Sequence, residues 1–450
     1  MLSAMGFIMI ALIIILLLKE KMSPVAVMVI IPTIAAFLVG TNINDLSAYV
    51  TDGMDSIKSN AFMFIFSILF FGIMSDVGVF DALVDKLAAW AADNPVKITV
   101  STALIATIAH LDGSAAATLL ITVPAMLPIY RKMGMRSQTL LTVIAASVGV
   151  MNLLPWGGPT VRAATVIGMD PTDLWRELIP IQILGVFLSL GTAVILGLRE
   201  KKYALANLNL TNSTETVNAR TETSGPAIDK EAEEKEVNPR FKKLLPVNII
   251  LTIGIIGLLM ANKVVDLPSY YVFMLGTVIA MIINFPNLKD QNAQIKKHAA
   301  SALSIVATIM AAGVMVGIME GTGMLDAMAN TLINIIPESL GKYIHVIFGI
   351  LGGPLGMITG TDAYFYGILP PLAGVGEAFG IKSIYTAIAM ILGKNCILLL
   401  SPMVPATWLG LGLFDDEITL RGHIKSSFGW CYGISLIMLI FGILFGIIAV

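Results

Sequence analysis

The chain has 450 residues, of which 56% are hydrophobic and only 13% are charged, and its formal net charge is −2. Soluble globular chains carry about a quarter charged residues, so this composition excludes an ordinary soluble protein. Nucleic acid is excluded as a partner because the sequence has no basic stripe to meet phosphates. The composition predicts an all-α polytopic membrane protein.

Apolar runs that could cross about 30 Å of hydrocarbon recur along the chain. The first run begins without basic residues, which favours a transmembrane helix over a removable signal peptide. Five spans are expected in the first half, at 3–19, 23–41, 60–76, 138–154 with a continuation after a break to about 169, and 178–198. Five more are expected in the second half, at 245–262, 269–286, 301–320, 384–400 with a broken continuation to about 413, and 427–449.

Two other apolar stretches, 96–130 and 343–376, are each split near the middle by glycine with polar or acidic residues. Each half has about 15 residues, which is short for a membrane crossing. We therefore predict that each stretch forms a re-entrant helical hairpin. The segments 79–92 and 324–336 mix charged and apolar residues, which predicts amphipathic helices at the membrane interfaces.

An internal repeat relates the two halves of the chain. Matching residues lie 245 apart at Gly72, Gly78 and Asp81 against Gly317, Gly323 and Asp326, and 247 apart at Gly113, Pro124 and Pro155 against Gly360, Pro371 and Pro402. These matches indicate two copies of one unit, at 1–198 and 245–450, each with five transmembrane helices and one hairpin. Because each unit crosses the membrane an odd number of times, the second copy starts on the opposite side. Two inverted-topology repeats are expected.

The copies are separated by a polar stretch at 199–244, which is predicted to be a mostly disordered linker. Lys and Arg concentrate in this linker and in alternate loops. Since cytoplasmic loops are enriched in these residues, we expect the linker to be cytoplasmic and both termini to lie outside the cell membrane.

Four interruptions of helical sequence occur at membrane depth, at the two hairpin tips and in the loops 155–160 and 401–407. Matched breaks in two inverted halves are typical of a transporter's binding site, where helix N-termini face an anion. The alternative is that Gly and Pro only kink packed helices. The residues expected to bind substrate at these breaks are Asp112, Gly113, Ser114, Gly157, Gly158, Thr160, Arg162, Gly360, Thr361, Asp362, Asn395, Ser401 and Thr407.

Charged residues near the breaks are functional candidates because a charge inside the bilayer is costly. Arg162 could hold a carboxylate in a bidentate pair, or serve as a structural arginine, and Lys394 is a second candidate cation. Asp112 and Asp362 could carry a coupling proton, meet a metal in a substrate complex, pair with one of these cations, or cap a helix. His110 is a third candidate for the coupling proton. No permanently bound cofactor is expected.

Four segments carry a family resemblance. They read ALIATIAHLDGSAAATLLITVPAMLPIY, MNLLPWGGPTVRAATVIGMDP, ITGTDAYFYGILPPLAGVGEAFGI and LLLSPMVPATWLGLGL. The first two resemble the first hairpin and broken helix of the CitMHS family of citrate–metal:proton symporters, and the last two resemble the second hairpin and broken helix. The resemblance covers both halves and leaves out only the linker.

The resemblance implies a secondary carrier that imports citrate or a related carboxylate, complexed with a divalent cation of the Mg or Ca class and driven by protons. It also implies an elevator motion and a homodimer. Sodium-coupled relatives have Ser-Asn-Thr at both tips, whereas this chain has Ser114-Ala-Ala and Thr361-Asp-Ala, which argues against that mode of sodium coupling. The other hypotheses are an antiporter or exporter of another organic or inorganic oxyanion, a channel, and an intramembrane enzyme. The last is disfavoured by the absence of HExxH and GxSxG motifs.

Overall fold

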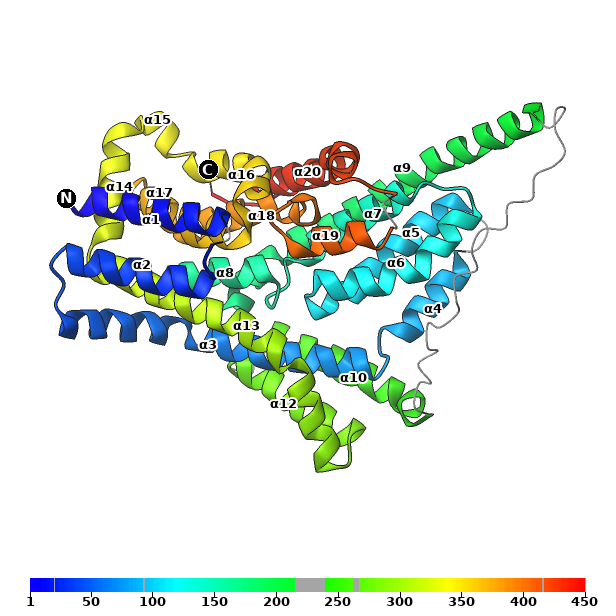
Figure 1. Cartoon of the computed structure of the whole chain (residues 1–450), viewed down its shortest axis with the longest axis horizontal. Helices are drawn as coiled ribbons and strands as arrows, with labels where there is room; N and C mark the ends of the chain where they lie inside the picture. The colour runs from blue at the N-terminus through cyan, green and yellow to red at the C-terminus, as the bar shows by residue number, and fades with distance from the viewer. Residues whose placement is uncertain (20, 92–93, 215–238, 262–266, 415–416, 450) are drawn as a thin grey trace.

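The computed structural model describes residues 1–19, 21–91, 94–214, 239–261, 267–414 and 417–449, and these ranges are helical without strands (Figure 1). The all-α prediction is therefore confirmed for this part of the chain. The first half contains α1 (Leu2–Leu18), α2 (Pro24–Leu38), α3 (Ile43–Asp76), α4 (Asp81–Trp90), α5 (Pro95–Ala109), η1 (His110–Asp112), α6 (Ala115–Lys132), α7 (Ser137–Met151), α8 (Gly158–Val166) and α9 (Pro171–Thr214). The second half contains α10 (Pro239–Met260), α12 (Ser269–Asn284), α13 (Leu288–Gly321), α14 (Met324–Ile335), α15 (Glu338–Gly341), α16 (Ile344–Asp362), η2 (Ala363–Ile368), α17 (Leu369–Ala378), α18 (Ser383–Asn395), η3 (Leu398–Leu400), α19 (Pro405–Gly412) and α20 (Leu420–Leu444).

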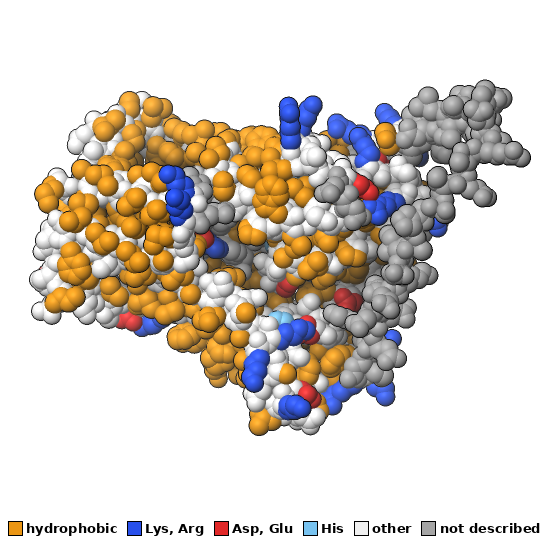
Figure 2. All heavy atoms as spheres, in the orientation of Figure 1, with side chains coloured by type: hydrophobic (Ala, Val, Ile, Leu, Met, Phe, Trp, Pro, Cys, Tyr) orange, Lys and Arg blue, Asp and Glu red, His pale blue; other side chains and the backbone are white. Residues whose placement is uncertain are grey.

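Several of these helices could cross a bilayer. Within the described ranges, six stretches meet the requirement by length and composition, namely α3, α9, α10, α13, the stretch Ile344–Ala378 and α20. Four more apolar helices are shorter, namely α1, α2, α7 and α12. Figure 2 shows hydrophobic side chains over most of the left half of one face, with charged side chains gathered mainly over the right half. This segregation is typical of a protein with a lipid-facing belt.

Two helices begin well before the spans expected from hydropathy. The spans at 60–76 and 301–320 are the apolar ends of α3 and α13, which each have 34 residues. A hydropathy window detects only the apolar part, whereas the helix begins where its first N–H groups are capped. At the start of α3 the Asn42 side chain accepts hydrogen bonds from the N–H groups of Asn44 and Asp45, at 2.9 Å each.

Helix α9 also differs from the prediction, because it continues past 198 to Thr214. The expected disordered linker 199–244 therefore starts as helix, and α10 begins at Pro239, before the expected end of the linker. The reason is composition, since eight of the eleven residues at 200–210 are Ala, Leu, Lys or Glu, which are good helix formers. Glu200 anchors this part of α9, since its buried carboxylate accepts from Thr139 Oγ1 at 2.7 Å and pairs with Arg136 at 2.6 Å. Residues 215–238 lie outside the described residues.

The stretches expected to form hairpins are helix pairs with a turn between them. In the first, α5 and α6 pack together and are joined through η1 and Gly113, whose φ is 75°. In the second, α16 leads to η2 and α17, and the backbone leaves helical geometry at Gly360, where φ is 69° and ψ is −177°. Gly113 and Gly360, 247 positions apart, thus share a positive φ, which only glycine adopts readily. The helices α4 and α14 occupy the positions expected for amphipathic segments.

Helices α3 and α13 run antiparallel along one side of the molecule, with α2 packed against α13 (Figure 1). Their backbones approach closely at Gly53 and Gly317, where a methyl group on Gly317 would lie 2.8 Å from the Cα of Gly53. Further along, a methyl group on Gly72 would lie 2.6 Å from the ring of His298. Small residues let membrane helices approach in this way because lipid supplies no hydrophobic drive for association.

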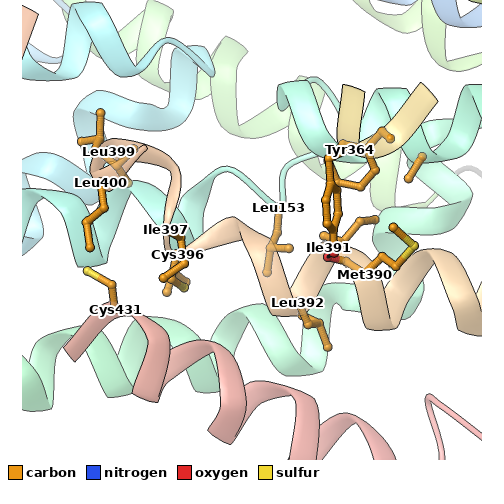
Figure 3. Packing of buried hydrophobic residues seen from close by; sticks show 14 of the residues in the cluster. Leu153, Tyr364, Met390, Ile391, Leu392, Cys396, Ile397, Leu399, Leu400 and Cys431 are labelled. Carbon is orange, nitrogen blue, oxygen red and sulfur yellow. Dashed lines mark hydrogen bonds between the residues drawn. The ribbon is translucent and has the colours of Figure 1, made fainter. Parts of the chain in front are cut away.

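The interior is centred on α18, which packs against α16, α17 and α20. Figure 3 shows Cys396 and Cys431 among Leu399, Leu400 and Ile397, with Tyr364 standing beside Met390 and Ile391. Both cysteines are buried free thiols, as their positions in apolar runs predict.

Candidate functional site: the second hairpin tip and the ion pair beside it

An ion pair joins the two halves of the chain at the second hairpin tip. Arg162 Nε donates to Asp362 Oδ1 at 2.6 Å, although the two residues are 200 positions apart in sequence. Arg162 belongs to α8, directly after the first broken loop, and Asp362 ends α16 beside Gly360. The side chains are 16% and 25% exposed, so both charges are largely removed from solvent but still reachable. The structure therefore selects Asp362 as the acidic partner of Arg162.

The guanidinium of Arg162 is held from a second direction. Its Nη1 donates to the carbonyl oxygen of Gly158 at 3.0 Å, one helical turn earlier in α8. With Nε on Asp362, only Nη2 is left without a hydrogen bond among the described residues. The ion pair is thus aimed and fixed by the first turn of α8.

A second basic group lies on the other side of the same tip. Lys394 Nζ donates to Thr361 Oγ1 at 2.8 Å, and the lysine is only 3% exposed. The ammonium also faces the rings of Tyr364 and Phe365, with centroids 5.7 and 5.6 Å away. Such cation–π contacts partly replace the water that a buried ammonium loses. Two basic groups therefore flank one carboxylate at this tip.

The hydroxyl groups at the broken loops are engaged by the backbone. Thr160 donates to the Leu153 carbonyl, Ser401 to that of Met357 and Thr407 to that of Leu398. These contacts satisfy carbonyl groups that an interrupted helix leaves without N–H partners. Gly157 also bonds within its loop, since its N–H donates to the Leu154 carbonyl at 2.7 Å. The hydroxyl oxygens can still accept hydrogen bonds, but their protons are already donated to backbone carbonyl groups.

The first hairpin tip is organised differently. The Asp112 carboxylate accepts from the N–H of Ser114 at 2.8 Å, and Ser114 in turn caps α6 by accepting from the N–H of Ala117. Gly113 packs against Trp156, whose indole N–H donates to the Leu111 carbonyl at 2.8 Å. Of the roles open to Asp112, the structure shows a local turn contact and no pairing with Arg162 or Lys394 among the described residues.

His110 and Asn395 are buried with unused hydrogen-bonding atoms. His110 Nδ1 lies 2.9 Å from Thr118 Oγ1, while its Nε2 has no partner among the described residues. Asn395 accepts from Asn152 Nδ2 at 3.4 Å, and its own Nδ2 has no partner there. Neither residue contacts the Arg162–Asp362 pair directly, so the expected site divides into a second-tip cluster and a separate interior group.

A cavity of about 520 Å³ opens onto the second tip. Its walls come from the tip, from Met403 and Pro405 at the second break, and from the loop between α1 and α2. That loop contributes Lys21, which the sequence analysis counted only as part of the charge bias. Helices α1 and α2, which flank this loop, have 17 and 15 residues. In the sequence, the signal for Lys21 as a site residue was its place as a basic residue between two short apolar runs.

The family of citrate transporters named CitMHS matches residues 1–393 of the chain. The chain belongs to this family. It is 32% identical over 449 residues to the citrate transporter of Bacillus subtilis, and 34% identical over 450 residues to the Mg(2+)/citrate complex secondary transporter of the same organism. In both comparisons 100% of each chain is covered. The CitMHS family and these relatives are transporters rather than enzymes, and this member is a multi-pass membrane protein.

Two solved transporters share the fold. The YdaH transporter of Alcanivorax borkumensis superposes with a TM-score of 0.59 at 16% identity, covering 90% of each chain. MtrF of Neisseria gonorrhoeae superposes with a TM-score of 0.60 at 12% identity, covering 88% of this chain and 84% of its own. At this level of identity the likeness concerns the fold alone.

Proposed function

We propose that this CitMHS member is a secondary active transporter that imports citrate, or a closely related carboxylate, as a complex with a divalent cation and together with protons. The names of its two relatives supply the substrate and the magnesium complex. The observation that carries the proposal is the second tip, where Thr361 and Asp362 line a cavity and are bonded by Lys394 and Arg162 respectively. A small polyanion bearing a metal would find cations and a carboxylate together there.

The substrate site centres on the second tip and includes Arg162, Thr361 and Asp362, with Lys394 behind Thr361. The remaining expected residues line the breaks and shape the site through their backbone. They are Asp112, Gly113, Ser114, Gly157, Gly158, Thr160, Gly360, Asn395, Ser401 and Thr407. Helix N-termini at the breaks add N–H groups that favour an anion. The coupling proton is carried by Asp112, Asp362 or His110.

We further propose that the two halves are inverted repeats carrying re-entrant hairpins. The crossing of α3 and α13 supports this arrangement. At an offset of 245 the contact between Gly53 and Gly317 becomes a contact between His298 and Gly72, which is also present. Equivalent helices that run antiparallel belong to units of opposite orientation. The linker is then cytoplasmic, both termini lie outside, and a homodimer completes the assembly.

Transport by the purified protein in proteoliposomes tests the function. Uptake of labelled citrate is measured with a chelator, with Mg²⁺ or with Ca²⁺, each with an inwardly directed proton gradient and with that gradient collapsed. We expect accumulation only with a metal and a gradient. Absence of citrate uptake under all of these conditions would overturn the proposal. Uptake that requires carboxylate inside the vesicle would assign the alternative, an antiporter.

A further inference from the structure

The carboxylate of Asp362 occupies one edge of the Arg162 guanidinium, where a substrate carboxylate would bind. A guanidinium binds a carboxylate best through two adjacent N–H groups. In Arg162, Nε donates to Asp362 and one N–H of Nη1 donates to the Gly158 carbonyl, so Asp362 occupies the guanidinium edge that includes Nε. A bidentate contact of substrate with the Nε edge therefore requires that Asp362 leave the guanidinium.

The release of Asp362 has an electrostatic consequence. Its carboxylate lines the cavity of about 520 Å³ and is 25% exposed, so it is only partly hydrated. Removing one partner of a largely buried ion pair leaves an uncompensated charge, which is strongly unfavourable. Free citrate would add its own negative charges next to this carboxylate. A metal–citrate complex instead brings a cation that can take the place of Arg162.

The charges around the tip match such a complex. Arg162 and Lys394 are basic, and Asp362 is the acidic group beside them. Together these three groups carry one net positive charge when Lys394 is protonated. A complex of trivalent citrate with a divalent cation carries one negative charge, so the complex balances the net charge of these three groups. Neutrality matters because isolated charge is costly at membrane depth.

A buried tyrosine near the Arg162–Asp362 pair has a hydroxyl group that is not hydrogen-bonded to the described residues. Tyr366 is fully buried, and its hydroxyl has no hydrogen-bond partner among the described residues. It lies near enough to Arg162 and Asp362 to interact electrostatically with both. Tyr366 belongs to η2, a π-helical turn that starts directly after Asp362, and such turns are frequent at functional sites. The Tyr366 hydroxyl can donate a hydrogen bond to Asp362 once it is released, or to the substrate carboxylate that replaces it.

The protein supplies few metal ligands of its own. Among the described residues, no group of three or more His, Cys, Asp or Glu side chains is placed to hold a metal ion. Mg²⁺ and Ca²⁺ prefer oxygen ligands and need about six or more of them. The substrate carboxylates, water and one protein carboxylate together meet that need.

We propose, building on the metal–carboxylate transport proposed above, that the Arg162–Asp362 pair is exchanged on binding. The guanidinium takes a substrate carboxylate, the released Asp362 carboxylate ligates the divalent cation of the same complex, and Tyr366 donates a hydrogen bond to one of these carboxylates. Asp362 is then the residue that makes the site require the complex rather than free citrate.

Binding measurements on the purified full chain test the exchange. Affinities for citrate with a chelator and for citrate with Mg²⁺ are compared by isothermal titration. We expect the wild type to prefer the complex by about tenfold or more, since free citrate would leave Asp362 unpaired. In Asp362→Asn the ratio of the two affinities should fall toward one, because Arg162 is no longer paired and no carboxylate at position 362 can ligate the cation. A preference equal to that of the wild type would overturn the exchange. Asp55→Asn, at an exposed surface pair, is the matched control and should keep the wild-type ratio.

A second variant covers failure of Asp362→Asn to fold. Asp362→Glu keeps the charge but extends it by one methylene, so the relative affinity for Mg²⁺–citrate and Ca²⁺–citrate should shift by several-fold. An unchanged metal order would show that the carboxylate does not touch the cation, which overturns the exchange. Failure of the transport function itself looks different, since the wild type would then neither bind nor import citrate with any metal.

Discussion

Gly149 of α7 and Cys396, which follows α18, are in direct backbone contact. A methyl group on Gly149 would lie 2.3 Å from the Cα of Cys396. The two positions are 247 residues apart, the same separation as the hairpin glycines Gly113 and Gly360. The helix before the first break and the segment before the second break therefore touch at positions that have this same separation.

Gly149→Ala should push the two broken helices apart. Overpacking a close contact typically costs about 1–3 kcal/mol, so we expect a clear fall in Tm and reduced uptake. Thermal unfolding in detergent, followed by size-exclusion chromatography, measures this. Gly254→Ala is the matched control, since a methyl group there would meet nothing within 4 Å. Equal Tm values for the two variants would contradict the close approach.

Gly360→Ala should damage the second tip more than overall folding. The backbone there has φ 69° and ψ −177°, a conformation that residues other than glycine adopt at a cost of about 1–3 kcal/mol. The tip is expected to move away from Arg162 and Lys394, which lowers uptake at least several-fold in protein that still elutes as a single peak. Gly429→Ala, in a helix with open space around it, serves as the comparison. Normal uptake by Gly360→Ala would show that transport does not depend on the backbone conformation of the second tip.

Arg162→Ala should abolish citrate uptake while the protein still reaches the membrane. The change removes the guanidinium and leaves Asp362 unpaired beside the cavity. Arg162→Lys should retain only partial uptake, because an ammonium keeps the charge but lacks the planar fork. Uptake in proteoliposomes, normalised to reconstituted protein, checks both. The control is Lys58→Ala, which removes an exposed pair of little energetic weight. Transport by Arg162→Ala at the wild-type rate would exclude the arginine from the site.

Lys21→Gln should raise KM for the metal–citrate complex and leave kcat nearly unchanged. An exposed charge in contact with an anion contributes about 1 kcal/mol, which corresponds to roughly a fivefold change in KM. Lys19→Gln is the matched control, because Lys19 lies in the same loop but does not line the cavity. Equal KM values for the two variants would place Lys21 outside the substrate path.

Thiol labelling gives an independent check on Lys21. The native Cys396 and Cys431 are buried, so a Lys21→Cys variant should be the principal target of a hydrophilic thiol reagent added to the purified protein in detergent. Substrate complex should slow its labelling and should not slow that of Lys19→Cys. Labelling that is indifferent to substrate would contradict a shared cavity.

The sequence alone determined the helical class, the order of the elements and the places where the helices break. Each of these depends on local properties, such as apolar runs, Pro and Gly at the breaks, and polar residues at the tips. The starts of α3 and α13 and the end of α9 were misplaced because hydropathy reports only the apolar part of a helix. These helices continue through polar sequence, and in α3 the Asn42 side chain caps the start.

Only the tertiary structure decided which charged groups meet. Two carboxylates and two cations near the breaks were equivalent candidates from sequence, and the fold paired Asp362 with Arg162 while leaving Asp112 in a local turn. The fold also placed Lys21, which lies between α1 and α2, in the wall of the cavity. Ion pairs between residues 200 positions apart depend on how whole helices pack, and no local pattern in the chain encodes that distance.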